Sequence, residues 1–190
     1  MGAVGRGAGV AAALAALACA CLLRAPQASA GVAVVDDAGA RVALAQPARR
    51  IVALAPHATE LLFAAGAGAR VVGVVAGSDF PPAAATIPQV GDANAIDLER
   101  LVALAPDLVV TWPYTTAAQL AAIRRRGIAV FTSDAKTIDG IAVDLERLGT
   151  LAGTPEAAAR AARAFRAAID AARPRGASPR EPTRVFYEIW

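Results

Sequence analysis

The segment PHATE, Pro56 to Glu60, holds the two side chains best suited to chemistry: His57, the only histidine, and Glu60. A lone histidine is a poor metal site. The chain also has no G-x-G-x-x-G fingerprint, no P-loop, no metal-spaced cluster and no Ser, His and Asp set in a hydrolase context. His57 could contact a ligand or simply complete a turn, and both interpretations stay open. We therefore predict a binding protein that is not an enzyme.

Aromatic side chains offer a second kind of chemistry, because their rings can stack on the flat face of a ligand. Trp112 and Tyr114 follow directly after an apolar run. Phe80 lies in a long loop, residues 77–94, which contains three prolines and has no regular period. Loops of this length in a compact domain are commonly functional or mobile. The alternative for each aromatic residue is ordinary packing within the domain.

These residues must be positioned by the elements that precede them. Residues 51–55 form a short apolar run typical of a strand buried on both faces, and Pro56 ends it. From Ala58 the pattern becomes helical, with Thr59 and Glu60 in the predicted first turn and Gly66 as a left-handed cap. Further strands are predicted over residues 71–75, 108–112 and 128–131. Strands that alternate with helices in this way predict an α/β fold, a mainly parallel sheet with helices on both faces.

In such a sheet, ligands bind in the crevice beyond the carboxyl ends of the strands. Pro56, His57 and Glu60 follow the first strand of the sheet, and the loop with Phe80 and Asn94 follows the second. We expect them to lie close together.

The remaining segments complete the predicted fold. A hairpin is predicted over residues 32–45, and Asp97 is expected to cap a helix that runs through Leu104. Further helices are predicted over residues 116–126, 137–151 and 154–173, and a strand over residues 184–190. For the last of these helices, Thr154 is the predicted cap and Pro155 the first residue. Two heptapeptides, RIVALAP from Arg50 and RLVALAP from Arg100, are nearly identical, but their contexts predict a strand for the first and a helix for the second.

Residues 1–30 have the pattern of an export signal. Arg6 provides the positive charge, residues 10–23 form an apolar run that is short for a membrane span, and residues 28–30 fit a small-x-small cleavage site. The mature protein is expected to begin at Gly31 and to be periplasmic.

Both cysteines, Cys19 and Cys21, lie inside this signal, so we expect a mature protein without thiols. A lipoprotein anchored at Cys19 and an uncleaved membrane anchor are the alternatives. Without Arg6 and Arg24, 17 basic residues remain of 19 against 16 acidic ones. This near-neutral balance predicts no nucleic-acid partner.

Several segments together carry a resemblance to a known family, although no single one is decisive. They are RIVALAPHATELLFAAGAGARVVGV, the SDFPP loop, QVGDAN, DLERLVALAPDLVV, GIAVF and the helix opened by TPE. In their order and spacing they resemble the periplasmic substrate-binding proteins of ABC importers for cobalamin, haem and ferric siderophores, over nearly all of residues 50–190.

The resemblance implies a division of the chain into parts. Residues 31–153 would form a Rossmann-like N-terminal lobe, with the family domain starting at about residue 50, and residues 154–173 the helix that joins two lobes. Residues 174–190 would be a linker and the first strand of a truncated second lobe. The ligand would lie between the lobes, and Glu60 matches the acid with which the family docks on arginines of the membrane permease.

The ligand that the resemblance favours is a cobalamin, with no cofactor besides. The haem branch usually has an iron-ligating tyrosine where this chain has Phe80, and no arginine occurs between residues 71 and 94 to attract an anionic siderophore. We expect a monomer whose ligand contacts come from Pro56, His57, Phe80, Asn94, Trp112, Tyr114 and Trp190. A haem or ferric-siderophore binding protein is the alternative within the family. A nucleotide-binding half-domain of an enzyme and a structural export module are the alternatives outside it.

Overall fold

The computed structural model describes residues 31–92, 95–173, 184 and 186. The predicted export signal, most of the predicted linker and strand over residues 174–190, and two predicted site residues, Asn94 and Trp190, lie outside the described residues.

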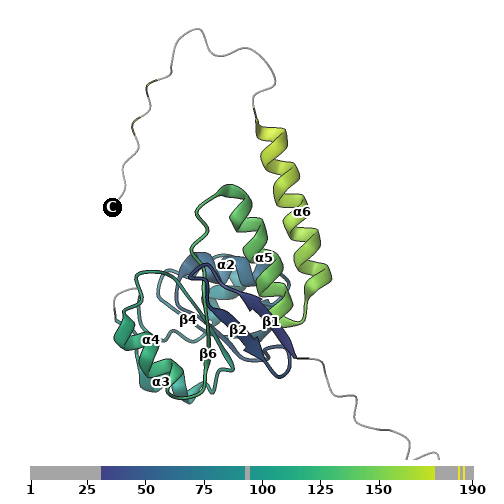
Figure 1. The fold of residues 1–190 in the computed structure, drawn as a ribbon. Helices are drawn as coiled ribbons and strands as arrows, with labels where there is room; N and C mark the ends of the chain where they lie inside the picture. Colours follow the sequence, from purple (N-terminus) through teal and green to yellow (C-terminus); the bar gives the residue numbers. More distant parts are fainter. Residues whose placement is uncertain (1–30, 93–94, 174–183, 185, 187–190) are drawn as a thin grey trace, which may run out of the picture.

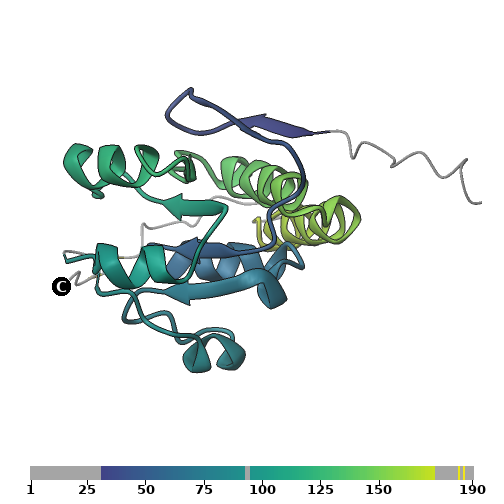
Figure 2. The same ribbon diagram turned by 90° about the horizontal axis from the view of Figure 1, so that it is seen from below.

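Four parallel strands form the central sheet, in the order β4-β3-β5-β6 (Figures 1 and 2). They are β3 (Ile51–Ala53), β4 (Val71–Val74), β5 (Leu108–Thr111) and β6 (Ala129–Thr132). This confirms the predicted parallel sheet. Three of the strands end one or two residues earlier than predicted, and β6 begins and ends one residue later.

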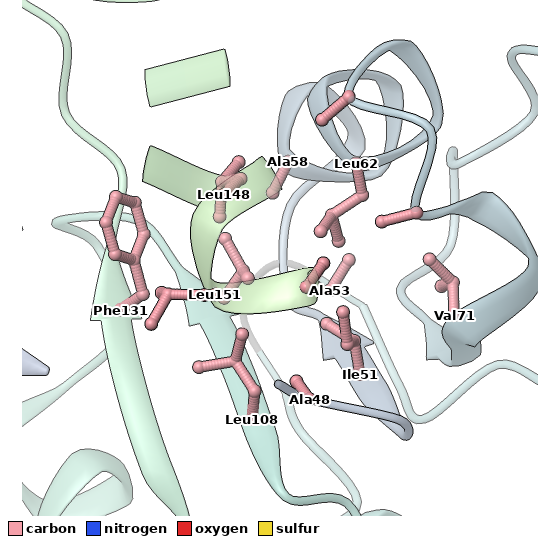
Figure 3. Close-up of a cluster of buried hydrophobic side chains, with 14 of the residues drawn as sticks. Ala48, Ile51, Ala53, Ala58, Leu62, Val71, Leu108, Phe131, Leu148 and Leu151 are labelled. Atoms are coloured by element: carbon pink, nitrogen blue, oxygen red, sulfur yellow. The ribbon is translucent and has the colours of Figure 1, made fainter. Parts of the chain in front are cut away.

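Helices cover both faces of this sheet, as predicted. Ile51 and Ala53 point toward one face, where α2 (Pro56–Ala64) and α5 (Ile138–Ala152) pack on them (Figure 3). Val52 points to the opposite face and packs with residues of α3 (Leu98–Ala103) and α4 (Ala117–Arg124). Because successive side chains of a strand point to opposite faces, the apolar run fills two cores at once.

Helix α2 begins two residues earlier than predicted, with Pro56 at its first position. Glu60 is therefore the fifth helical residue, and the prediction that it lies in the first turn is wrong. Thr59 is buried, and its hydroxyl is 3.3 Å from Ser78 Oγ. Pro56 lacks an N–H and has a fixed φ, which suits the first helical position as well as it suits the end of a strand. Gly66 has the predicted positive φ, 79°.

The last helix, α6 (Pro155–Ala172), packs side by side with α5 (Figures 1 and 2). Thr154 is the N-cap residue, as predicted, but its hydroxyl makes no cap hydrogen bond and instead donates to the carbonyl of Ala65, 2.8 Å away, at the end of α2. Arg166 of α6 pairs with Asp139 and Glu146 of α5, at 2.7 Å in each case. The contact with α5 is therefore partly polar, beside the buried Ala158 and Ala162.

The predicted hairpin is present as β1 (Val32–Val35) and β2 (Arg41–Leu44), antiparallel, with Gly39 at φ 76° in its turn. The long loop after β4 contains a short 3-10 helix, η2 (Pro82–Thr86), and another, η1 (Gly68–Arg70), precedes β4. Asp97 caps α3 as predicted, since its carboxylate accepts from Arg100 N at 2.9 Å.

Candidate ligand-binding site

The strand order places a crevice beyond the carboxyl ends of the strands. From β3 the chain crosses first to β4 on one side, and later to β5 and β6 on the other. The segments that follow β3 and β5 therefore depart from neighbouring strands in different directions. This is the topological switch point at which parallel α/β sheets bind ligands.

A pocket of about 570 Å³ opens there, which we call the cleft pocket. Its volume lies in the range of small-molecule sites. Its lining comes from α2, from the segments that follow β4, β5 and β6, and from α5 and α6. The lining residues are His57, Glu60, Leu61, Ala64, Phe80, Trp112, Pro113, Tyr114, Ser133, Asp134, Ala135, Ile141, Leu145 and Phe165.

Aromatic rings form a cluster along one side of the cleft pocket. The ring centroids of Trp112 and Tyr114 are 4.7 Å apart, and those of His57 and Trp112 are 6.1 Å apart. Tyr114 and Phe80 are strongly exposed, at 76% and 63%. Large exposed aromatic surface at a concave site is costly unless a partner covers it, so these rings are well suited to stack on a flat, bulky ligand.

The polar side chains of the cleft pocket are acidic or neutral. Desolvation lowers the pKa of His57, while a hydrogen bond with the Ser133 backbone and the charges of Glu60 and Asp134 act in the opposite direction. The lowered pKa favours a neutral imidazole near neutral pH. No Lys or Arg is among the described residues that line the pocket. The cleft pocket therefore offers little attraction to an anionic ligand.

The predicted site residues differ in where the structure places them. His57, Phe80, Trp112 and Tyr114 all line the cleft pocket, and so does Glu60. Pro56, the first residue of α2, does not line the pocket.

Three consecutive lining residues, Ser133 to Ala135, were missed by the sequence analysis. They follow β6 as Trp112 to Tyr114 follow β5, so the same argument from strand ends could have found them. Ile141, Leu145 and Phe165 were missed for a different reason. They lie on α5 and α6, and only the packing of these helices brings them to the crevice.

Behind Ser133 lies a buried acidic residue, Asp144, which is fully inaccessible to solvent. Its carboxylate accepts from Ser133 Oγ at 2.7 Å and lies 3.3 Å from Arg147 Nη1. Arg147 is shared with a second carboxylate, that of Asp37, at 2.7 Å. Desolvation raises the pKa of Asp144 to about 6, which the Ser133 hydrogen bond opposes and the charge of Asp37 reinforces.

Within the described part of the chain, no group of three or more His, Cys, Asp or Glu side chains could hold a metal ion. In the same residues, no helix is long and apolar enough to cross a membrane.

Comparison with known proteins shows a family and several relatives that this chain resembles. Residues 51–189 match the family described as periplasmic binding protein. A vitamin B12-binding protein of Vibrio cholerae serotype O1 is 39% identical over 144 residues, which are 75% of this chain and 52% of that protein. A vitamin B12-binding protein of Yersinia pestis is 40% identical over 149 residues, 76% of this chain and 52% of that protein. The chain thus spans about half the length of these relatives.

Solved structures agree with the sequence comparison. The crystal structure of the periplasmic vitamin B12 binding protein of Vibrio cholerae superposes with a TM-score of 0.63 at 39% identity, covering 66% of this chain and 49% of that one. The periplasmic heme-binding protein of Roseiflexus sp. RS-1, in its apo form, has a TM-score of 0.60 at 31% identity over the same shares.

Proposed function

The chain belongs to the periplasmic binding protein family, and on this premise we propose that it captures a cobalamin-type ligand for an ABC importer. The relatives at 39% and 40% identity are named vitamin B12-binding proteins. We propose further that the protein is exported to the periplasm, acts there as a monomer and delivers its ligand to the permease of the importer.

The single observation that carries the choice of ligand is the character of the cleft pocket. Ring surface comes from Trp112, Tyr114 and Phe80, and apolar surface from Leu61, Leu145 and Phe165. The acidic and imidazole side chains of the lining are His57, Glu60 and Asp134. A corrinoid is bulky, flat and largely neutral, so stacking and apolar contact can hold it without basic side chains. Haem carries two carboxylates, and many ferric siderophores are anionic. These ligands would meet the carboxylates of Glu60 and Asp134, and among the described residues the one cation paired with either of them, Lys136, is 2.6 Å from Asp134 Oδ1 and outside the lining.

Haem remains the second candidate because one relative of solved structure, at 31% identity, is a heme-binding protein. The described lining contains one imidazole, His57, that could approach an iron atom. Phe80, in the loop after β4, has no atom that can ligate iron.

Calorimetric titration of the purified protein with cyanocobalamin, haemin and a ferric hydroxamate tests the proposal. We expect saturable binding of cyanocobalamin with one site per chain, and weaker or undetectable binding of the other two ligands. Tighter binding of haemin would reverse the order of the two candidates, and binding of none of the three would contradict the proposed function.

A further inference from the structure

Strand β6 lies at the edge of the sheet, and its last residues lead directly into the wall of the cleft pocket. An edge strand leaves alternate backbone N–H groups without a ladder partner. Here the turn of the β1–β2 hairpin supplies the partners. Thr132 N donates to Asp36 Oδ2 at 3.1 Å, and Asp134 N donates to Asp37 Oδ2 at 2.6 Å.

The N–H between these two belongs to Ser133, and it points the other way, to the carbonyl of Thr111 in β5 at 2.8 Å. The pocket wall is thus fixed on one side by the sheet and on the other by the hairpin. A return bond from Asp37 N to Thr132 O, 3.1 Å, closes the connection.

Asp37 is itself held in place by its second oxygen. Asp37 Oδ1 is 2.7 Å from Arg147 Nη1 of α5, and the same nitrogen is 3.3 Å from Asp144 Oδ1. Asp144 in turn accepts a hydrogen bond from the hydroxyl of Ser133. One carboxylate, that of Asp37, therefore joins the hairpin, the pocket wall and α5.

We propose that Asp37 is a positioning residue for the cleft pocket: it fixes the wall from Ser133 to Ala135 in the shape that receives the ligand. The hairpin that carries it precedes residues 51–189, which match the family, so the match does not include it. The ligand part of this inference rests on the proposed function. The positioning itself rests on the hydrogen bonds and the ion pair of Asp37.

The substitution Asp37→Asn tests the inference with little change of shape. A carboxylate accepts hydrogen bonds at both oxygens, whereas an amide presents one acceptor and one donor group. The new amide cannot accept from both Asp134 N and Arg147, so one of these donors must face another donor. Asp170→Asn is the matched control, because Asp170 also pairs with an arginine, Arg173, but on the exposed surface of α6 at 3.4 Å.

Two measurements are made on wild type and both variants. Amide hydrogen exchange without ligand should be about tenfold faster over residues 133–135 in Asp37→Asn, with β3 and β5 unchanged. The dissociation constant for cyanocobalamin should rise about tenfold. Asp170→Asn should match the wild type in both.

The inference is overturned if exchange at the wall is unchanged in Asp37→Asn, or if it accelerates equally in β3 and β5, which would indicate a general loss of stability. It is also overturned if the wall exchanges faster while affinity stays at the wild-type value. If the wild type itself does not bind cyanocobalamin, the proposed function fails, and the exchange measurement alone decides whether Asp37 fixes the wall.

Discussion

Asp144 is a carboxyl group without solvent contact, and it shares one guanidinium, that of Arg147, with Asp37. Burial desolvates the carboxyl group of Asp144, and the nearby charge of Asp37 adds to this effect, so the pKa of Asp144 rises from 3.8 to about 6. An acid whose pKa is raised by folding binds its proton more tightly in the folded state than in the unfolded one. Folded stability therefore falls as the pH rises between 3.8 and about 6.

This predicts a pH dependence that Asp144→Asn removes. The unfolding free energy of the wild type, minus that of the variant, should fall by roughly 1 to 2 kcal/mol between pH 5 and pH 7.5. Urea denaturation at both pH values measures it, with Asp170→Asn as a control for the loss of one carboxylate. A difference that stays constant or grows over this range would contradict the ionisation of a buried Asp144.

Tyr114 offers a second prediction for a single residue. Its side chain is 76% exposed and touches Trp112, so Tyr114→Ala should change folded stability little while removing stacking surface from the cleft pocket. We expect affinity for cyanocobalamin to fall by roughly 1 kcal/mol, about fivefold. The control is Ile138→Ala, which removes an exposed apolar side chain outside the cleft pocket. Equal losses in the two variants would argue against stacking by Tyr114.

Which lining residues could be predicted from sequence depended on how far each lies from a strand end. His57, Trp112 and Tyr114 follow strands within a few residues, so the parallel sheet alone brings them together. Phe165 lies in the middle of α6, and it reaches the cleft pocket only because α6 packs on α5. Sequence periodicity describes the apolar stripe of a helix, but not the neighbour that this stripe will meet.

Among the elements, the pair α5 and α6 shows how close packing depends on small residues. Gly149 lies in α5 against α6, and a Cβ at this position would overlap the Cβ of Ala158. Alanine normally favours a helix over glycine by roughly 1 kcal/mol. At position 149 the overlap with Ala158 should make alanine less stable than glycine.

Gly149→Ala is therefore expected to destabilise the protein by roughly 1 to 3 kcal/mol, measured by urea denaturation. The double variant Gly149→Ala with Ala158→Gly should recover part of this loss, because the overlapping methyl group is gone. A stabilising Gly149→Ala, or a double variant with no recovery, would show that the two helices are not in close contact at this point.

The two similar heptapeptides show what local sequence can decide. In the first, residues 51–53 form β3, and in the second, residues 100–103 belong to α3, as their contexts predicted. Asp97 makes the difference, because its cap starts a helix just before the second copy. Ala105 has a positive φ of 44°, which ends the helical path. A hydrogen bond joins the two copies, from Arg50 Nε to Leu104 O at 2.8 Å. It was not predictable, because only the fold brings these two residues together.

At the scale of the whole molecule, the chain spans about half the length of its relatives, so docking to a permease remains a proposal. Glu60 is exposed and is one of the residues that line the cleft pocket. In a protein that carries both lobes, Glu60→Gln should leave ligand affinity within about twofold and weaken the complex with the permease by at least roughly 1.4 kcal/mol, or tenfold.

Surface plasmon resonance against the purified permease measures the complex with the permease, and calorimetry measures affinity for the ligand. The matched control is Glu156→Gln, an exposed acid in the first turn of α6 outside the cleft pocket. Equal permease binding by wild type and Glu60→Gln would exclude Glu60 as a docking contact. A large loss of ligand affinity would place it among the ligand contacts instead.

The attachment of α6 has a mechanical consequence. Near its start, helix α6 is held by the hydrogen bond from Thr154 to the carbonyl of Ala65. Along its side, it is held by the ion pairs between Arg166 and two acidic residues of α5. Its 18 residues give a rod of about 27 Å. A tilt of about 5° at the base of such a rod displaces its tip by roughly 2 Å. A small change in the angle at which α6 packs on α5 therefore produces a larger displacement of the backbone at Ala172, the last residue of the helix.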